Sequence, residues 1–183
     1  MIRLLLWILG AMLLGGIVHL STVLAMPKAA TQDAYSRLLP LTPVNTMVPI
    51  APPSADASVM PFMDPAFAAA VCRYDLSSGI VKFNAPLSQA YTSVTFYTRN
   101  SVAYYAIDDR AAGRRAIELD LMTPEQHAQV PEGEDVTAAD RLIIESPTKT
   151  GLIVLRALAP EAGLMPMARQ ALANAKCRIG PVQ

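Results

Sequence analysis

An uncharged, strongly apolar run opens the chain and extends from Leu4 to Met26, between Arg3 and Lys28. Its 23 residues would form a helix about 34 Å long, and a hydrocarbon core is about 30 Å thick. Lipid offers the backbone no hydrogen-bond partners, so a spanning segment is expected to be helical. The pattern predicts a transmembrane anchor over residues 1–27. The alternative is a signal peptide cleaved near Ala25, although a signal sequence has a shorter apolar run of roughly 7–15 residues.

Prolines dominate the next segment, residues 28–65, which we interpret as a connector. Eight of the 15 prolines lie between residues 27 and 65. Proline interrupts helices and cannot donate to a sheet ladder, so most of this segment is expected to run extended or to act as a semi-rigid spacer. One short helix is predicted over residues 31–39.

Short runs of alternating apolar and polar residues, separated by turn residues, fill residues 66–183. They predict seven strands, over residues 68–76, 80–87, 91–98, 102–107, 116–122, 141–146 and 151–158. Two helices are predicted, one beginning at Thr123 and one over residues 165–176. Many short strands are typical of a sandwich or barrel rather than of a parallel α/β sheet. We therefore predict a mainly β domain, an antiparallel sandwich or barrel with two or three short helices, preceded by the transmembrane helix.

Composition narrows the classes of function. The chain is 52% hydrophobic and 16% charged, which excludes a disordered chain of low hydrophobicity and high net charge. The 15 lysines and arginines are balanced by 15 acidic residues. No positive excess is left to bind a phosphate backbone, so no nucleic-acid partner is expected.

Catalytic and metal-binding patterns are sparse. His127 is the one histidine outside the apolar run, and a single histidine with two separated cysteines does not make a zinc site. The acidic segment 132–140 lacks the spacing of a calcium-binding loop. We therefore predict no catalytic residue, no metal and no cofactor. His127, in a short polar helix, is expected to be solvated and without a partner.

The end of one predicted strand carries the most suggestive polar residues. Tyr105, Asp108, Asp109 and Arg110 are candidate binding residues that could line the mouth of a pocket. The alternative is an aspartate-rich turn with an arginine partner, because adjacent residues on a strand point to opposite faces.

Cys72 and Cys177 are the two cysteines of the chain, and we predict that they form a disulfide. Cys72 lies in the first predicted strand of the domain and Cys177 at the end of the last predicted helix. The alternative is a pair of reduced, buried cysteines. Because disulfides persist in oxidising compartments, the prediction places the domain outside the cytoplasm.

The chain resembles the short, membrane-anchored bacterial form of the domain of unknown function 1254 family. The residues that carry the likeness are 63–76 (MDPAFAAAVCRYDL), Pro86 and Leu87 with Tyr91, the strand ending in Asp108-Asp109-Arg110, and 142–147 running into 151–157. The resemblance implies an immunoglobulin-like sandwich and no established reaction. Longer members carry a second β-rich domain, which this chain is too short to contain.

Two functions follow as expectations. The first is a single-pass protein of the inner membrane with its domain in the periplasm, acting as a non-enzymatic binding or assembly module of the cell envelope. Its partner would be a separate protein that supplies the second domain. The second is an enzyme or enzyme subunit, hydrolase-like, with a site near Asp108, Asp109 and Arg110.

Overall fold

The computed structural model describes residues 1–29, 33–54, 58–112, 116–130 and 142–181. The chain divides into two compact units, Met1–Asp33 and Ala34–Gln183, which we describe separately. Three parts of the sequence prediction lie outside the described residues. They are the acidic segment 132–140, residue 141 at the start of an expected strand, and residue 31 at the start of an expected helix.

The first unit contains a long helix, α1 (Ile2–Ala29). Within the described part of the chain it is the one helix that is long and apolar enough to cross a membrane, over Ile2–Met26. The predicted apolar helix is therefore present. A membrane anchor and a signal sequence share this length, composition and position near the N-terminus.

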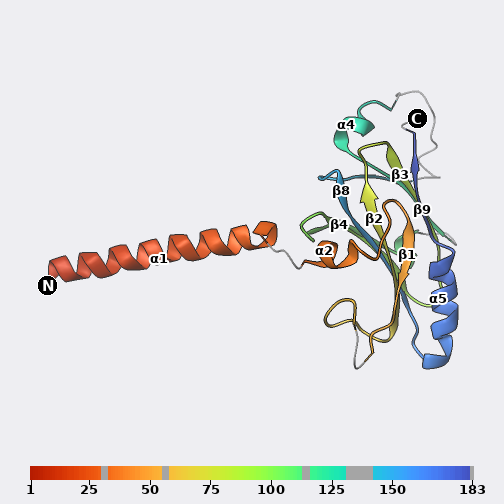
Figure 1. Cartoon of the computed structure of the whole chain (residues 1–183), viewed down its shortest axis with the longest axis horizontal. Coiled ribbons are helices and arrows are strands. Elements are labelled where there is room, and N and C mark those ends of the chain that lie inside the picture. The colour runs from red at the N-terminus through yellow and green to blue at the C-terminus, as the bar shows by residue number, and fades with distance from the viewer. Residues whose placement is uncertain (30–32, 55–57, 113–115, 131–141, 182–183) are drawn as a thin grey trace. The chain divides into compact units, whose positions relative to one another are not determined.

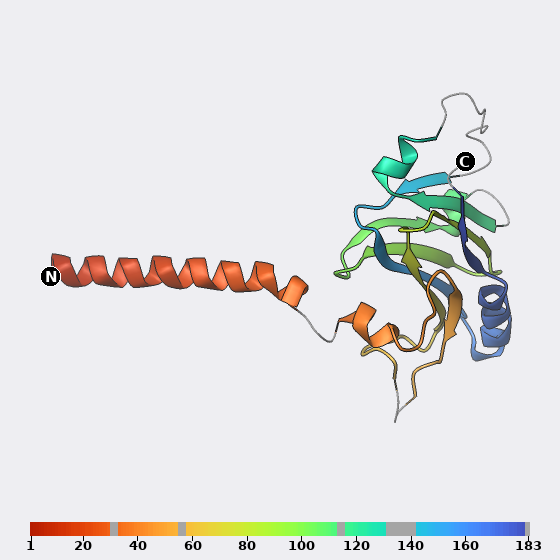
Figure 2. The same cartoon turned by 45° about the horizontal axis from the view of Figure 1, so that its top comes forward.

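Nine strands of the described residues form two sheets in the second unit (Figures 1 and 2). The first sheet has the order β1 (Met47–Ile50), β2 (Phe67–Asp75), β8 (Thr150–Leu158), β4 (Thr92–Thr98) and β5 (Ala103–Asp108), with all neighbours antiparallel. The second has the order β7 (Leu142–Glu145), β6 (Ala116–Met122), β3 (Ile80–Pro86) and β9 (Lys176–Gly180). Here β6 and β7 are parallel, which the long connection between them permits.

The core lies between the inner faces of the two sheets. Along β4 and β3, alternate residues such as Phe96 and Phe83 are buried, and their rings meet edge-on across the sheets with centroids 6.4 Å apart. Both inner faces are apolar, so the two sheets bury these faces by packing against each other. The predicted mainly β sandwich with a leading helix is confirmed.

The helices of the second unit are short. They are α2 (Ala34–Leu38), α3 (Asp109–Ala112), α4 (Pro124–His127), α5 (Met165–Ala173) and the 3₁₀ turn η1 (Ala162–Leu164). The helix predicted to begin at Thr123 is present as α4, where Thr123 and Gln126 form a capping box. Ala168 and Leu172 of α5 are buried and extend the core beyond the sheets.

Two segments differ from the sequence prediction. The predicted helix over residues 165–176 ends at Ala173, and residues 176–180 form strand β9 instead. Cys177 pairs there with Phe83 of β3, so strand pairing overrides the local preference for helix. The range interpreted as a connector contains both α2 and β1, which pack on the domain. β1 tolerates Pro49 because it is an edge strand.

Cys72 of β2 and Cys177 of β9 form the predicted disulfide, with Cα atoms 6.4 Å apart. Both cysteines are buried in the core. The bond joins the first sheet to the second, rather than attaching a helix end as the sequence suggested.

Candidate functional site

The outer face of the first sheet is covered in part by residues that precede β2. Tyr35 and Leu38 of α2 are buried against Val71 and Leu152 of that sheet. The guanidinium of Arg99 lies 4.0 Å from the centroid of the Tyr35 ring, a cation–π contact. These contacts hold α2 on the sheet.

A second fastening follows α2. Arg73, which projects from β2 on the same outer face, donates hydrogen bonds from Nε and Nη2 to the Thr42 carbonyl oxygen, at 3.1 and 3.0 Å. Its guanidinium also lies 6.0 Å from the Tyr35 ring centroid. Arg73 therefore fixes the turn that leads from α2 to β1.

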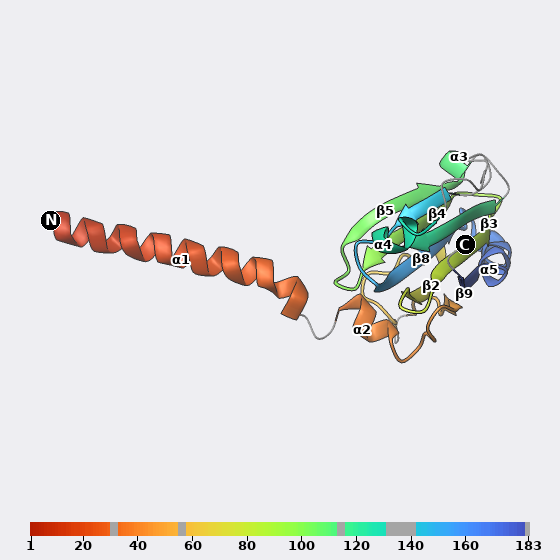
Figure 3. The ribbon, with the colours of Figure 1, turned by 90° about the horizontal axis from the view of Figure 1, so that it is seen from above.

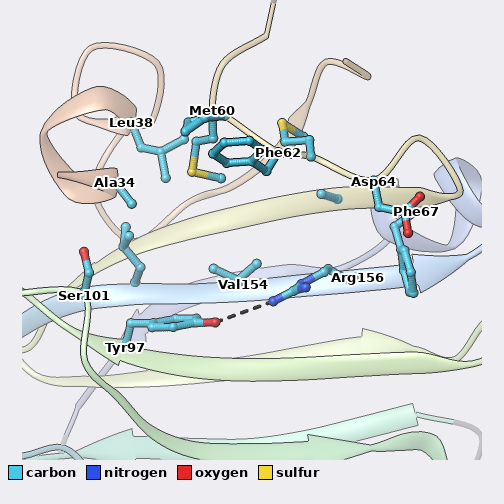
Figure 4. Close-up of a pocket in the computed structure, with 14 residues that line it drawn as sticks. Ala34, Leu38, Met60, Phe62, Asp64, Phe67, Tyr97, Ser101, Val154 and Arg156 are labelled. Carbon is cyan, nitrogen blue, oxygen red and sulfur yellow. Dashed lines mark hydrogen bonds between the residues drawn. The ribbon is translucent and has the colours of Figure 1, made fainter. Parts of the chain in front are cut away.

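Between this covering segment and the sheet lies a cavity of about 390 Å³, which we call the apolar hollow (Figure 4). Its floor is formed by outward-facing residues of the sheet and its wall by α2 and residues 60–64. Its lining includes Leu38, Met60, Phe62, Asp64, Phe67, Tyr97, Leu152, Val154 and Arg156. In Figure 4, Met60 and Phe62 face Val154 across the hollow. The volume is typical of a small-ligand pocket.

A second cavity, of about 410 Å³, lies on the same outer face towards the other end of β4 and β5. We call it the polar hollow. Its lining includes Phe67, Tyr91, Ser93, Thr95, Asp108 and Arg156. Phe67 and Arg156 also line the apolar hollow, so the two cavities adjoin at these side chains. Together they form a two-part groove that is apolar at one end and lined by hydroxyl and charged groups at the other.

Arg156 stands at the junction of the two hollows. It is exposed, and its Nη2 donates to the Tyr97 hydroxyl at 3.5 Å, as the dashed line in Figure 4 shows. Arg156 was not among the predicted site residues. The signal for it was a single charged residue at an outward position of the otherwise apolar run GLIVLRAL.

Phe62 lies at the rim of the apolar hollow in an unusual state. Its side chain is fully exposed, and its backbone is left-handed, with a φ of 59°. A large aromatic residue rarely adopts this backbone conformation, and residues that do are concentrated at functional sites.

The four predicted binding residues do not converge on one cavity. Tyr105 packs towards the core, with its ring centroid 6.0 Å from that of Phe96. Asp108 lines the polar hollow, and its Oδ1 accepts a hydrogen bond from the Ala111 N–H at 2.9 Å, which begins α3 at the end of β5 (Figure 3). Asp109 and Arg110 belong to α3, outside the residues that line either hollow.

The two α3 residues have separate surroundings. The Thr92 N–H donates to Asp109 Oδ1 at 3.4 Å, which ties α3 to the start of β4. Arg110 is exposed. Of the four, Asp108 alone lines one of the two hollows.

A buried hydroxyl cluster lies at the opposite end of the sheet. The Tyr74 hydroxyl is 2.9 Å from Ser146 Oγ and 3.3 Å from the Tyr104 hydroxyl, and it donates to the Tyr97 carbonyl at 3.2 Å. Burial, together with the neighbouring Tyr74, raises the pKa of Tyr104, so this phenol stays protonated. The cluster joins strands and is not poised as a nucleophile.

His127 has a partner, contrary to the sequence prediction. Its Nδ1 lies 2.6 Å from Glu145 Oε1 of β7, and the two side chains are 43% and 51% exposed. The partner is 18 residues away and could not be inferred from local sequence. Among the described residues, no group of three His, Cys, Asp or Glu side chains is placed to hold a metal ion.

Comparison with known proteins identifies the family. The model of a family described as protein of unknown function, DUF1254, matches residues 44–178. The chain is a member of the DUF1254 family. No curated protein matches it.

Two solved structures share the fold. The VPA0106 protein from Vibrio parahaemolyticus is 12% identical, with a TM-score of 0.60 over 85% of this chain and 35% of that one. A protein from Burkholderia cenocepacia is also 12% identical, with a TM-score of 0.50 over 76% of this chain and 36% of that one. The chain therefore corresponds to about a third of the length of each solved protein.

Proposed function

We propose that this chain is a membrane-anchored binding module of the cell envelope, without catalytic activity of its own. The observation that carries the binding role is the two-part groove on the outer face of the first sheet. The apolar hollow is of small-ligand size, and an arginine stands where it meets a polar surface. This combination of an apolar cavity with a few placed polar groups is typical of a binding site.

The location outside the cytoplasm, on the periplasmic face of the inner membrane, is supported by the disulfide. Cytoplasmic reductants keep most protein thiols reduced, whereas Cys72 and Cys177 are bonded within the core. The helix α1 would span the inner membrane and so hold the domain at its periplasmic face.

A binding role is favoured over the hydrolase-like alternative by the placement of the candidate residues. An acid–base pair must be within hydrogen-bond reach of one reacting group. Tyr105 packs on the core side of β5, whereas Asp108 lines the outer polar hollow. One oxygen each of Asp108 and Asp109 accepts a backbone N–H.

The partner we propose is a separate protein that supplies the portion present in longer family members. The chain covers 35% and 36% of the two solved proteins, so in each of them the matched fold is combined with further chain, and that further chain is the portion the proposed partner would supply. Isolation of the tagged full chain in mild detergent should recover that protein, and the second domain would be recognised in it by sequence.

Photo-crosslinking in living cells tests the binding role. A benzoylphenylalanine at position 62 places the reactive group at the rim of the apolar hollow. The matched control places it at position 178, on exposed β9 of the other sheet. We expect a covalent adduct from position 62 that is absent from position 178. No adduct at position 62, or the same adducts at both positions, would contradict a binding role for the groove.

A further inference from the structure

We propose that the two-part groove binds a single-chain amphiphile, with a linear acyl chain in the apolar hollow and a head group of one negative charge against Arg156. This inference rests on the proposed binding function and specifies its ligand.

The groove has the direction that such a ligand requires. Leu152, Val154 and Arg156 are alternate residues of β8 and line the apolar hollow in that order. Alternate strand residues point to one face, and the strand rises about 3.3 Å per residue, so about 13 Å separate the positions of Leu152 and Arg156. An extended chain lying along β8 would contact apolar groups first and reach a guanidinium at its end.

The surroundings of Arg156 favour an anion. Among the described residues, the Tyr97 hydroxyl is its hydrogen-bond partner, at 3.5 Å, and no carboxylate lies within 4.0 Å of its guanidinium nitrogens. A guanidinium carries five N–H donors in a fork that matches a carboxylate or phosphate diester. Ser93 and Thr95 of the polar hollow add hydroxyl groups that can donate to the same head group.

Two carboxylates limit the charge of the head group. Asp64 lines the apolar hollow and Asp108 the polar one, and one oxygen of each accepts a backbone N–H, from Ala66 and Ala111 respectively. Their negative charge would oppose a dianion close by. A fatty acid, or a lysophospholipid whose phosphate is a diester, meets this limit.

The rim of the apolar hollow supplies a cover for the acyl chain. Phe62 is fully exposed and has a left-handed backbone, and it faces Val154 beside the unbranched side chain of Met60 (Figure 4). An exposed aromatic residue held in a strained conformation gains burial when an apolar ligand lies beneath it. Methionine adapts to irregular apolar ligands.

Equilibrium binding of radiolabelled palmitate and of uncharged hexadecanol to the full chain in amphipol tests the proposal. Arg156→Gln should weaken palmitate binding about tenfold, the effect expected for a charge-assisted hydrogen bond, and leave hexadecanol binding unchanged. The matched control Arg178→Gln removes an exposed strand arginine of the other sheet and should leave both unchanged. Phe62→Ala, which removes a fully exposed side chain, should weaken the binding of both palmitate and hexadecanol.

Palmitoyl lysophosphatidylglycerol in the same assay distinguishes a membrane lipid from a free fatty acid. Tighter binding of the lysolipid identifies the lipid as the source, and tighter binding of palmitate identifies the fatty acid. The proposal would be overturned if neither palmitate nor the lysolipid bound, or if wild type and Arg156→Gln bound palmitate equally. A protein adduct instead of a lipid adduct in the crosslinking at position 62 would also overturn it, while leaving the binding role intact.

Discussion

Cys72 on β2 and Cys177 on β9 are bonded across the two sheets of the sandwich, although 105 residues separate them in sequence. The bond closes a loop that contains most of the domain. In the chain-entropy description, a closed loop of about 100 residues stabilises the fold by up to about 4.7 kcal/mol, by restricting the unfolded chain.

Removing this bond should destabilise the domain without changing its fold. We expect the double substitution Cys72→Ala/Cys177→Ala to lower the free energy of unfolding by about 2–5 kcal/mol. Thermal unfolding with and without reductant measures the effect. Reductant should lower the melting temperature of the wild type and leave that of the double variant unchanged. Equal melting temperatures for the wild type under both conditions would contradict the disulfide.

Gly151 should not tolerate a methyl group. A Cβ at this position would lie 2.2 Å from the Tyr97 carbonyl oxygen and 2.3 Å from the Tyr74 hydroxyl. Gly151→Ala is therefore expected to cost about 1–3 kcal/mol, as overpacking does, measured as a lower denaturant midpoint. Gly163→Ala is the control, because no atom lies within 4 Å of its added Cβ. Equal midpoints for the two variants would contradict the packing described around Tyr74.

Two neighbouring residues of α4 should differ in their contribution to stability. His127→Ala loses a half-exposed contact with Glu145, and such surface pairs contribute at most about 1 kcal/mol. Gln126→Ala loses the capping box and the hydrogen bonds that Nε2 donates to the Leu76 and Gly79 carbonyls, at 2.9 and 3.1 Å. Its expected cost is about 1–3 kcal/mol. Chemical denaturation compares them, and a larger effect of His127→Ala would be inconsistent with this structure.

The partly buried Tyr104 should make the domain sensitive to alkali. Because burial raises its pKa in the folded chain above the ordinary value of 10.0, folding favours the protonated phenol. The protonated phenol therefore contributes to the free energy of unfolding in full below about pH 10. That contribution is lost as the pH rises further, because the unfolded chain releases the proton more readily. Tyr104→Phe should reduce the fall in stability above pH 10, followed by denaturation at several pH values. Tyr91→Phe, at an exposed tyrosine, is the control. An unchanged slope for Tyr104→Phe would contradict the assignment.

The parts of the fold that were predictable from the sequence are those with a strong local pattern. The uncharged run of α1, the alternation of β6 and the cap at Thr123 each specify their element through neighbouring residues. Strand β9 was missed because its residues are specified by pairing with β3, a distant segment. β1 was missed because proline at residue 49 argues against a central strand, and its edge position could not be inferred locally.

The candidate site was less predictable than the fold, because it depends on tertiary contacts. Asp108 lines a hollow, whereas Tyr105 of the same strand packs towards the core, as the alternation of strand residues allows. Asp109 and Arg110 belong to α3, where strand alternation no longer applies. Arg156 becomes interesting only when β8 lies beside β4 and α2 covers the same face. The pairing of His127 with Glu145 likewise arises from the fold.

The central claim is that a membrane-anchored domain with a closed disulfide lies outside the cytoplasm. The most direct test is the intact mass of the chain from membranes of cells treated with a thiol-alkylating reagent before lysis and during denaturation. The account predicts the mass of the chain with α1 retained and with no alkyl group added. The mass of a shorter chain that begins at Met26 would contradict it, and so would the addition of two alkyl groups, at Cys72 and Cys177.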